Sequence, residues 1–272
     1  MILFETIKKR LADAGVKPNK TLGQNFLVNP GIYQKILAAL QITPGDIIVE
    51  VGSGLGTLTH HLARAGGKII GIEKDRLLAE YLKKEFPVNS RVEIVNQDIL
   101  EFNPKSYKLA ADKYKLVGNI PYYLTSRLLR TALNDWPRPK LMVLMVQKEV
   151  AQRITARPPK MSLLAVSVQY YSRPEIVSYV SRGSFYPIPK VDSAIIRLQP
   201  RAKGLEIRNF FRVVKVGFAN KRKQLASNLA RDLKIPKQIV IEELLSLNIS
   251  PQRRAETLTI EEWQKIAEKL VN

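Results

Sequence analysis

Residues 47 to 57 read I-I-V-E-V-G-S-G-L-G-T. A run of Ile and Val that passes directly into closely spaced glycines is typical of a buried parallel strand followed by a helix. Glycines at such a turn let a ligand approach the backbone, at the carboxyl end of the sheet where open α/β folds bind their ligands. The stretch therefore predicts a strand that ends near Gly52 and a ligand site at the glycine loop.

The same alternation of apolar strands and helices continues along the chain. It predicts a mostly parallel sheet with helices on both faces, and a last pair of strands, joined without a helix, that makes the end of the sheet antiparallel. The expected strands are 47–51, 68–74, 92–98, 114–119, 141–146, 175–180 and 193–198, and the expected helices are 3–14, 30–40, 57–65, 75–86, 125–133 and 161–171.

The character of the sequence changes after Pro200. Residues 201–272 show helical periodicity without a convincing strand, and they carry 15 Lys and Arg against 8 Asp and Glu. We therefore expect an α/β catalytic domain over residues 1–202 and a smaller all-helical domain over residues 203–272.

Net charge is the strongest bulk signal. Lys and Arg number 44 against 24 Asp and Glu, so that the formal net charge is +20. Such an excess favours a polyanionic partner, nucleic acid first and a membrane surface second. No apolar run approaches the roughly 18 residues of a membrane span, and the first residues lack the order of a signal peptide. These features predict a cytoplasmic protein without a membrane partner.

Cysteine is absent, and the only histidines are His60 and His61. The absence of cysteine excludes disulfides, thiolate zinc sites and a cysteine nucleophile. Adjacent histidines on a helix point in different directions and make a poor metal pair. We expect no metal.

Acidic residues lie at or near the carboxyl ends of three of the expected strands and indicate the kind of ligand. Glu50 lies beside the glycine loop, and Glu73 and Asp98 end the next two strands. The sixth position of the dinucleotide fingerprint is Thr57 instead of Gly or Ala. Three carboxylates would repel a pyrophosphate but suit the sulfonium and ammonium groups of S-adenosylmethionine. The alternative is that the glycines serve tight turns only.

A second motif, V-G-N-I-P-Y-Y at 117–123, places an amide, a proline and two phenols at the end of another expected strand. Pro121 cannot donate to a sheet ladder, so the strand should stop there. One interpretation is a turn plugged by an aromatic ring, and the other is a catalytic loop.

These motifs and their order resemble the ribosomal RNA adenine N6-dimethyltransferases, most of all the bacterial branch that acts on small-subunit ribosomal RNA. The resemblance covers nearly the whole chain. It rests on L-G-Q-N-F-L at 22–27, E-V-G-S-G-L-G at 50–56, G-I-E-K-D at 71–75, N-I-P-Y at 119–122, V-Q-K-E-V-A-Q-R at 146–153, F-Y-P-I-P-K-V-D-S at 185–193, G-F-A-N-K-R-K-Q-L at 217–225 and R-R-A-E-T-L-T at 253–259.

The resemblance implies a Rossmann-like class I methyltransferase fold and a defined reaction. That reaction is the S-adenosylmethionine-dependent N6,N6-dimethylation of two adjacent adenosines in the 3'-terminal hairpin loop of small-subunit ribosomal RNA, during ribosome biogenesis. The implied partner is the small ribosomal subunit with its RNA, with no DNA partner and a monomeric protein.

Carried onto this sequence, the cofactor contacts of the family fall on a short set of residues. Glu73 is expected to hold the ribose and Asp98 the adenine amine of the cofactor, while the segment of Asn25 and Leu27 folds over the pocket as a lid. The complete implied set is Asn25, Leu27, Gly52, Gly54, Glu73, Asp98 and Asn119.

The N-I-P-Y motif is the expected catalytic loop. The lone pair of adenine N6 is delocalised into the ring, and acceptors that bend the amine out of the ring plane would localise it. The side-chain oxygen of Asn119 and the backbone carbonyl of Ile120 or Pro121 are candidates for these acceptors. Tyr122 is expected to stack on the extracted base, and Phe185 on its opposite face.

Two positions depart from the family pattern. Tyr123 stands where relatives often have Asn, and Arg127 where many have Pro, which bears on the pocket of the target base. K-R-K at 221–223 is expected to contact ribosomal phosphates, its alternative being a solvated helix face.

Three other functions are compatible with parts of the sequence. The erythromycin-resistance methylases use the same chemistry on large-subunit RNA, but V-D-S at 191–193 and R-A-E at 254–256 favour the small-subunit branch. An assembly factor could keep the fold with little dependence on turnover. A nicotinamide oxidoreductase is disfavoured by the missing fingerprint glycine and by the net charge.

Overall fold

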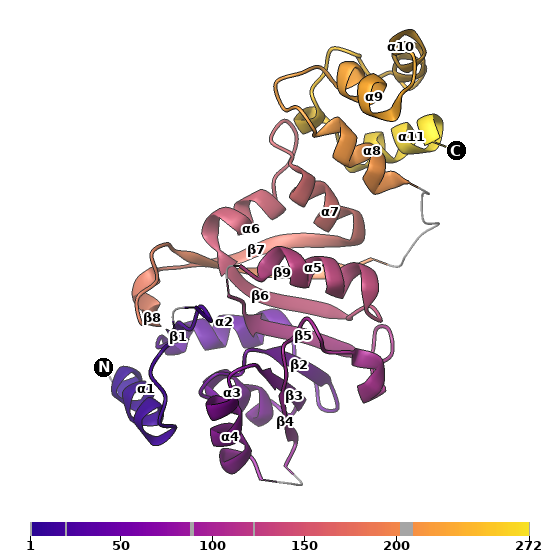
Figure 1. Ribbon diagram of the computed structural model, residues 1–272. Coiled ribbons are helices and arrows are strands. Elements are labelled where there is room, and N and C mark those ends of the chain that lie inside the picture. The colour runs from indigo at the N-terminus through magenta and orange to yellow at the C-terminus, as the bar shows by residue number, and fades with distance from the viewer. Residues whose placement is uncertain (1, 20, 88–89, 122, 202–208, 272) are drawn as a thin grey trace. The chain divides into compact units, whose positions relative to one another are not determined.

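The computed structural model describes residues 2–19, 21–87, 90–121, 123–201 and 209–271 (Figure 1). Its contacts divide the chain into two compact units. The first is Met1–Ala151 with Arg173–Pro200, and the second is Gln152–Ser172 with Arg201–Asn272.

A seven-stranded sheet forms the first unit, in the order β4-β3-β2-β5-β6-β9-β7. The first five strands of that order pair in parallel, and β6 pairs with β9 antiparallel. The expected parallel sheet with an antiparallel end is therefore confirmed. The strands are β2 (Ile47–Val51), β3 (Lys68–Glu73), β4 (Val92–Asn96), β5 (Tyr114–Asn119), β6 (Leu141–Gln147), β7 (Ser172–Val180) and β9 (Ser193–Pro200).

The helices of this unit begin where capping residues predict. Asn29 caps α2 by accepting from the Gly31 N–H, and Pro30 is the first helical residue. Asp75 caps α4 by accepting from Leu77 and Leu78. The bounds are α1 (Ile2–Asp13), α2 (Pro30–Leu40), α3 (Thr57–Arg64), α4 (Arg76–Glu85), η1 (Pro104–Tyr107), α5 (Thr125–Arg130), α6 (Lys148–Ile154) and η3 (Arg182–Ser184), and α5 continues into a π-helical turn, η2 (Thr131–Asp135).

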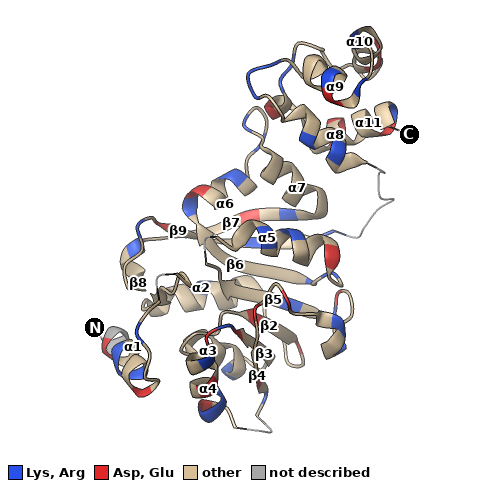
Figure 2. Ribbon diagram, viewed as in Figure 1, with Lys and Arg blue, Asp and Glu red and all other residues tan. Residues whose placement is uncertain are grey.

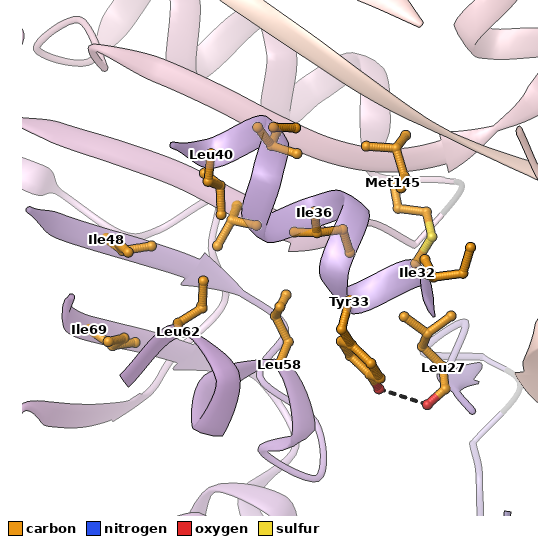
Figure 3. Close-up of a cluster of buried hydrophobic side chains, with 14 of the residues drawn as sticks. Leu27, Ile32, Tyr33, Ile36, Leu40, Ile48, Leu58, Leu62, Ile69 and Met145 are labelled. Carbon is orange, nitrogen blue, oxygen red and sulfur yellow. Dashed lines mark hydrogen bonds between the residues drawn. The ribbon is translucent and has the colours of Figure 1, made fainter. Parts of the chain in front are cut away.

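Helix α2 packs its apolar stripe against the sheet (Figure 3). Ile36 and Leu40 are buried with Ile48 and Ile69 in one cluster. Tyr33 from the same helix donates its hydroxyl to the Leu27 carbonyl at 2.7 Å. Because this bond is buried, it fixes the expected lid segment onto the core of the sheet domain.

Two very short strands join that segment to a distant loop. β1 (Phe26–Leu27) pairs antiparallel with β8 (Phe185–Tyr186), with Leu27 opposite Phe185. Two-residue strands have no periodicity of their own, so the sequence did not predict this pairing. It brings the L-G-Q-N-F-L and F-Y-P-I-P motifs side by side.

The second unit is helical, as expected for the end of the chain. Its core centres on Trp263 and Phe210, which are fully or almost fully buried. The elements are α7 (Leu163–Tyr171), α8 (Phe210–Gly217), α9 (Leu225–Leu233), α10 (Lys237–Ser246), η4 (Ala255–Thr257) and α11 (Ile260–Val271).

The expected division at residues 202/203 differs from this grouping. It assigned residues 152–172 to the α/β domain, whereas their contacts place them with the helical unit. The reason is that Ala165 and Val166 of α7 are buried in the same cluster as Phe210 and Val213. An apolar helix in the sequence does not reveal which core it joins.

Candidate active site

A cavity lies at the carboxyl ends of β2, β3 and β5. Its lining includes Asn25, Leu27, Gly52, Gly54, Glu73, Asp98, Asn119 and Pro121. All of the residues expected to contact the cofactor therefore share one pocket. Their places in the chain are far apart, and the parallel sheet brings them together because the carboxyl ends of its parallel strands meet at one edge.

The glycine loop has the backbone conformation that only glycine adopts easily. Gly52, Gly54 and Gly56 have φ angles of 70°, 57° and 73°. At Gly54 a Cβ atom would also lie 3.3 Å from the Phe26 ring. The loop thereby aims the Gly54 N–H at Glu73 Oε2, at 2.8 Å.

Glu73 is buried, and both of its oxygens are held by the backbone. The Asp75 N–H donates to Oε1 at 2.8 Å, opposite the bond from Gly54. Burial raises the pKa of this carboxyl, and the two N–H donors oppose that rise. Glu73 lines the cavity in a fixed orientation, and its contact with ribose hydroxyls stays a prediction.

Glu50 is 1% exposed and is held by two hydroxyls. Ser53 Oγ and Thr59 Oγ1 both donate to its Oε2, at 3.0 and 2.6 Å. Burial raises the pKa of Glu50 to about 7, against the effect of these hydroxyls. A cation in the cavity would favour its charged form.

Asp98 is paired with a residue that the sequence reasoning missed. Lys74 Nζ lies 2.8 Å from Asp98 Oδ2, and the Leu100 N–H donates to Oδ1 at 3.0 Å. Partial burial acts to raise the pKa of Asp98, but these two donors outweigh it and the net shift is downward. Lys74 lines the cavity. The only sequence signal for this pair was the position of Lys74 directly after the acid at the end of β3.

Asn119 joins the end of β5 to the lid segment. Its Nδ2 donates to the Asn25 carbonyl oxygen at 2.9 Å. No donor from the described residues is bonded to Asn119 Oδ1, so this oxygen can accept from a substrate. At Gly23, with φ 65°, a Cβ would lie 3.1 Å from Pro121 Cβ, and the lid therefore packs closely against the N-I-P-Y loop.

The remaining expected catalytic residues lie outside the cavity lining or outside the described residues. Ile120 and Phe185 are buried and do not line the cavity; the Ile120 N–H donates to the Met145 carbonyl at 3.0 Å. The part of Phe185 in base stacking stays a prediction. Tyr122 is outside the described residues, and its neighbour Tyr123 lines the cavity with 59% of its surface exposed.

A further contact holds the lid and was not expected. Gln24 Nε2 donates to Asp75 Oδ2 at 3.0 Å, which links the lid to the residue that caps α4. Gln24 stands inside the L-G-Q-N-F-L motif, so its signal was the motif as a whole.

The charges of the lining fit S-adenosylmethionine. Three carboxyl groups, Glu50, Glu73 and Asp98, line the cavity. Within the described lining, Lys74 is the sole Lys or Arg side chain, and it is paired with Asp98. A pocket of this charge favours a ligand with sulfonium and ammonium groups over a pyrophosphate.

The described part of the chain offers neither a membrane span nor a metal site. None of its helices combines the length and hydropathy that a membrane span requires. No cluster of three or more His, Asp or Glu side chains there is placed to bind a metal ion.

Comparison with known structures shows the same fold. A dimethyladenosine transferase from Plasmodium falciparum aligns with a TM-score of 0.76 at 27% identity, over 89% of this chain and 95% of that one. The 23S rRNA methyltransferase ErmE aligns with a TM-score of 0.74 at 28% identity, over 91% of this chain and 100% of that one.

Curated sequences give closer relatives. A protein from Dehalococcoides mccartyi named ribosomal RNA small subunit methyltransferase A is 41% identical, over 97% of this chain and 92% of its own length. One of the same name from Pelotomaculum thermopropionicum is 40% identical, over 95% and 93%. The family described as ribosomal RNA adenine dimethylase matches residues 15–272. The chain therefore belongs to that family, and it is an S-adenosylmethionine-dependent methyltransferase that acts on adenine in ribosomal RNA.

Proposed function

We propose that the protein dimethylates N6 of two adjacent adenosines in the 3'-terminal hairpin of small-subunit ribosomal RNA. It acts in the cytoplasm as a monomer on the assembling small subunit, and DNA is not a partner. One observation carries the choice of subunit. Relatives named for the small subunit are about 40% identical over nearly the full length, whereas the large-subunit enzyme is 28% identical.

The cofactor site uses the three carboxylates in different ways. S-adenosylmethionine supplies an activated methyl group on a positively charged sulfur. Glu73, held by two backbone N–H groups, accepts hydrogen bonds from the ribose hydroxyls. Asp98 accepts from the adenine amine while Lys74 fixes its orientation. Glu50 lies behind the glycine loop, and its charge favours a cationic ligand.

Asn119 orients the target amine. Its Nδ2 is held by the Asn25 carbonyl, so Oδ1 is presented in a fixed direction. When Oδ1 accepts an N–H of adenine N6, the nitrogen lone pair is drawn out of conjugation with the ring. The backbone carbonyl of Ile120 or Pro121 takes the second N–H. Correct positioning of this kind contributes as much as about 7 to 11 kcal/mol in favourable reactions.

The monomethylated product can react again at the same site. It retains one N–H, which Asn119 Oδ1 can accept. Tyr122 keeps the flipped base in place by stacking, as enzymes that act on bases require. A site that holds the base in this way supports two transfers without a second set of catalytic groups.

The helical domain, residues 203–272, holds the ribosomal RNA backbone. Lys221, Arg222 and Lys223 are exposed in the turn before α9. Contacts of this kind with phosphates position a protein without reading the sequence, and they weaken steeply with salt.

The experiment supplies labelled S-adenosylmethionine with unmethylated small subunits, unmethylated large subunits, or each RNA free of protein. We expect label on the small-subunit RNA, with partly assembled small subunits as the best substrate. Label mainly on large subunits would replace the proposal by the erythromycin-resistance activity. Binding to small subunits without transfer would favour an assembly factor.

A further inference from the structure

A second group of residues gathers at the same edge of the sheet, beyond the cavity. Lys148 directly follows β6, and Asp192 directly precedes β9. The Lys148 N–H donates to the Asp192 carbonyl at 3.0 Å, and the Arg182 N–H donates to Asp192 Oδ1 at 3.0 Å. Asp192 thereby holds the start of α6 and the segment after β7 together.

The exposed ring of Tyr179 lies beside Lys148 of this group. Its neighbour Val180 is buried in the core cluster that α2 covers, and Ser178 accepts from Lys35 of α2. Alternation along β7 therefore turns Tyr179 to the opposite face, where 52% of its surface is exposed. Lys148 Nζ lies over the ring, 5.4 Å from its centroid.

The distance from the catalytic loop suits a neighbouring nucleotide. Asn119 of β5 pairs with Met145 of β6, and Gln147 of β6 pairs with Ser193 of β9. β7 is the next strand. Three steps of roughly 4.8 Å put β7 about 14 Å from β5 across the sheet. The segment between β7 and β9 carries two basic residues, Arg182 and Lys190 (Figure 2).

We propose that Tyr179, Lys148 and Arg182 form a subsite for a nucleotide that flanks the target adenine. Its base stacks on the Tyr179 ring, and its phosphate contacts the Lys148 ammonium and the exposed Arg182 guanidinium. Extraction of the target adenine breaks its stacking with adjacent bases. An aromatic ring with cations beside it restores stacking and charge compensation to such a base.

An exposed tyrosine on an edge strand often binds no partner. Three features set Tyr179 apart: the cation over its ring, the bonds of the Lys148 and Arg182 backbone N–H groups to Asp192, and a position at the end of the sheet that holds the catalytic loop. The inference rests on the proposed function, in which the target adenosines lie in a hairpin loop of ribosomal RNA.

The test measures affinity for a hairpin RNA with unpaired adenosines in its loop, by fluorescence titration, and the KM for the same RNA. Tyr179→Ala should weaken binding between about fivefold and a hundredfold, the usual range for loss of one base stack. Tyr179→Phe should bind normally, because the ring and not the hydroxyl stacks. Affinity for S-adenosylmethionine and the melting temperature should be unchanged in both variants.

Lys148 has a matched control at the other end of β6. Lys148→Gln should weaken RNA binding and reduce its salt dependence. Lys140→Gln, at the exposed residue just before β6 on the opposite edge, should do neither. Normal RNA affinity in Tyr179→Ala, or equal effects of the two lysine variants, would overturn the subsite. The titration needs no turnover, so its result is independent of which ribosomal subunit is methylated.

Discussion

The two ends of the Asn119 amide differ in their partners. Its nitrogen donates to the Asn25 carbonyl, and no donor from the described residues is bonded to its oxygen. Glu73 and Glu50 are likewise held by groups of the protein before any ligand arrives. Such preorganisation means that substitutions at Asn119 and Glu73 should change binding or rate more than folding.

Asn119→Ala should reduce single-turnover methylation at saturating S-adenosylmethionine by at least roughly tenfold. The reason is the loss of an acceptor that acts mainly in the transition state. Melting temperature measured in parallel is the control. A normal rate with a lowered melting temperature would return the N-I-P-Y motif to the alternative of a plugged turn.

Glu73→Ala should weaken S-adenosylmethionine binding by about 1.5 to 3 kcal/mol, the usual range for hydrogen bonds to a charged group. Isothermal calorimetry measures this directly. The matched control is Glu80→Ala on the exposed side of α4, which should bind the cofactor normally. Unchanged affinity in Glu73→Ala would remove this residue from the site.

The raised pKa of Glu50 predicts that the stability of the ligand-free protein depends on pH. The pKa of its carboxyl is about 7 in the folded protein against an ordinary value near 4.5. Between these values the folded chain keeps a proton that the unfolded chain releases. The contribution of Glu50 to the unfolding free energy therefore falls as pH rises through that window.

Glu50→Gln should remove this fall in the unfolding free energy with rising pH. A glutamine oxygen can still accept from Ser53 and Thr59, which both bond to one oxygen of Glu50. Relative to the unsubstituted protein, the variant should gain stability between pH 5 and pH 8, by an amount on the order of 3 kcal/mol. Urea denaturation at both pH values measures the gain. A constant difference between the two proteins would contradict the raised pKa.

At the scale of elements, the sequence was informative where one pattern extended over a whole strand or helix. β5 matches its expected bounds, 114–119, and β2 its bounds 47–51. β1 and β8 were not predicted because a two-residue strand is defined by its partner alone. The Lys74–Asp98 pair was also missed, because its members are 24 positions apart in the chain and come together only through the pairing of β3 with β4.

The close contact of β2 and β5 makes a prediction about stability. A Cβ on Gly118 would lie 2.5 Å from the Val51 carbonyl oxygen, and a backbone atom cannot move aside cheaply. Gly118→Ala should lower the unfolding free energy by about 1 to 3 kcal/mol, the usual cost of overpacking. Gly183→Ala is the control, because a Cβ there would meet its nearest neighbour at 3.7 Å. Equal melting temperatures for the two variants would show that β2 and β5 can move apart enough to accommodate the added methyl group.

At the scale of the whole molecule, composition predicted the partner class and the helical character of the chain's end. A net charge of +20 pointed to nucleic acid, and the family confirms an RNA substrate. Composition could not assign α7 to its unit, because the burial of Ala165 and Val166 depends on helices that lie 44 and more residues later in the chain. The preference for the small-subunit branch likewise came from V-D-S at 191–193 and R-A-E at 254–256 rather than from charge.

The most direct test of the central claim is mass spectrometry of ribosomal RNA after reaction of unmethylated small subunits with S-adenosylmethionine. The account predicts N6,N6-dimethyladenosine at two adjacent positions in the 3'-terminal hairpin loop of the small-subunit RNA. The same treatment of large subunits should leave their adenosines unmodified. Monomethyladenosine as the only product, or modification at a single position or in the large subunit, would contradict it.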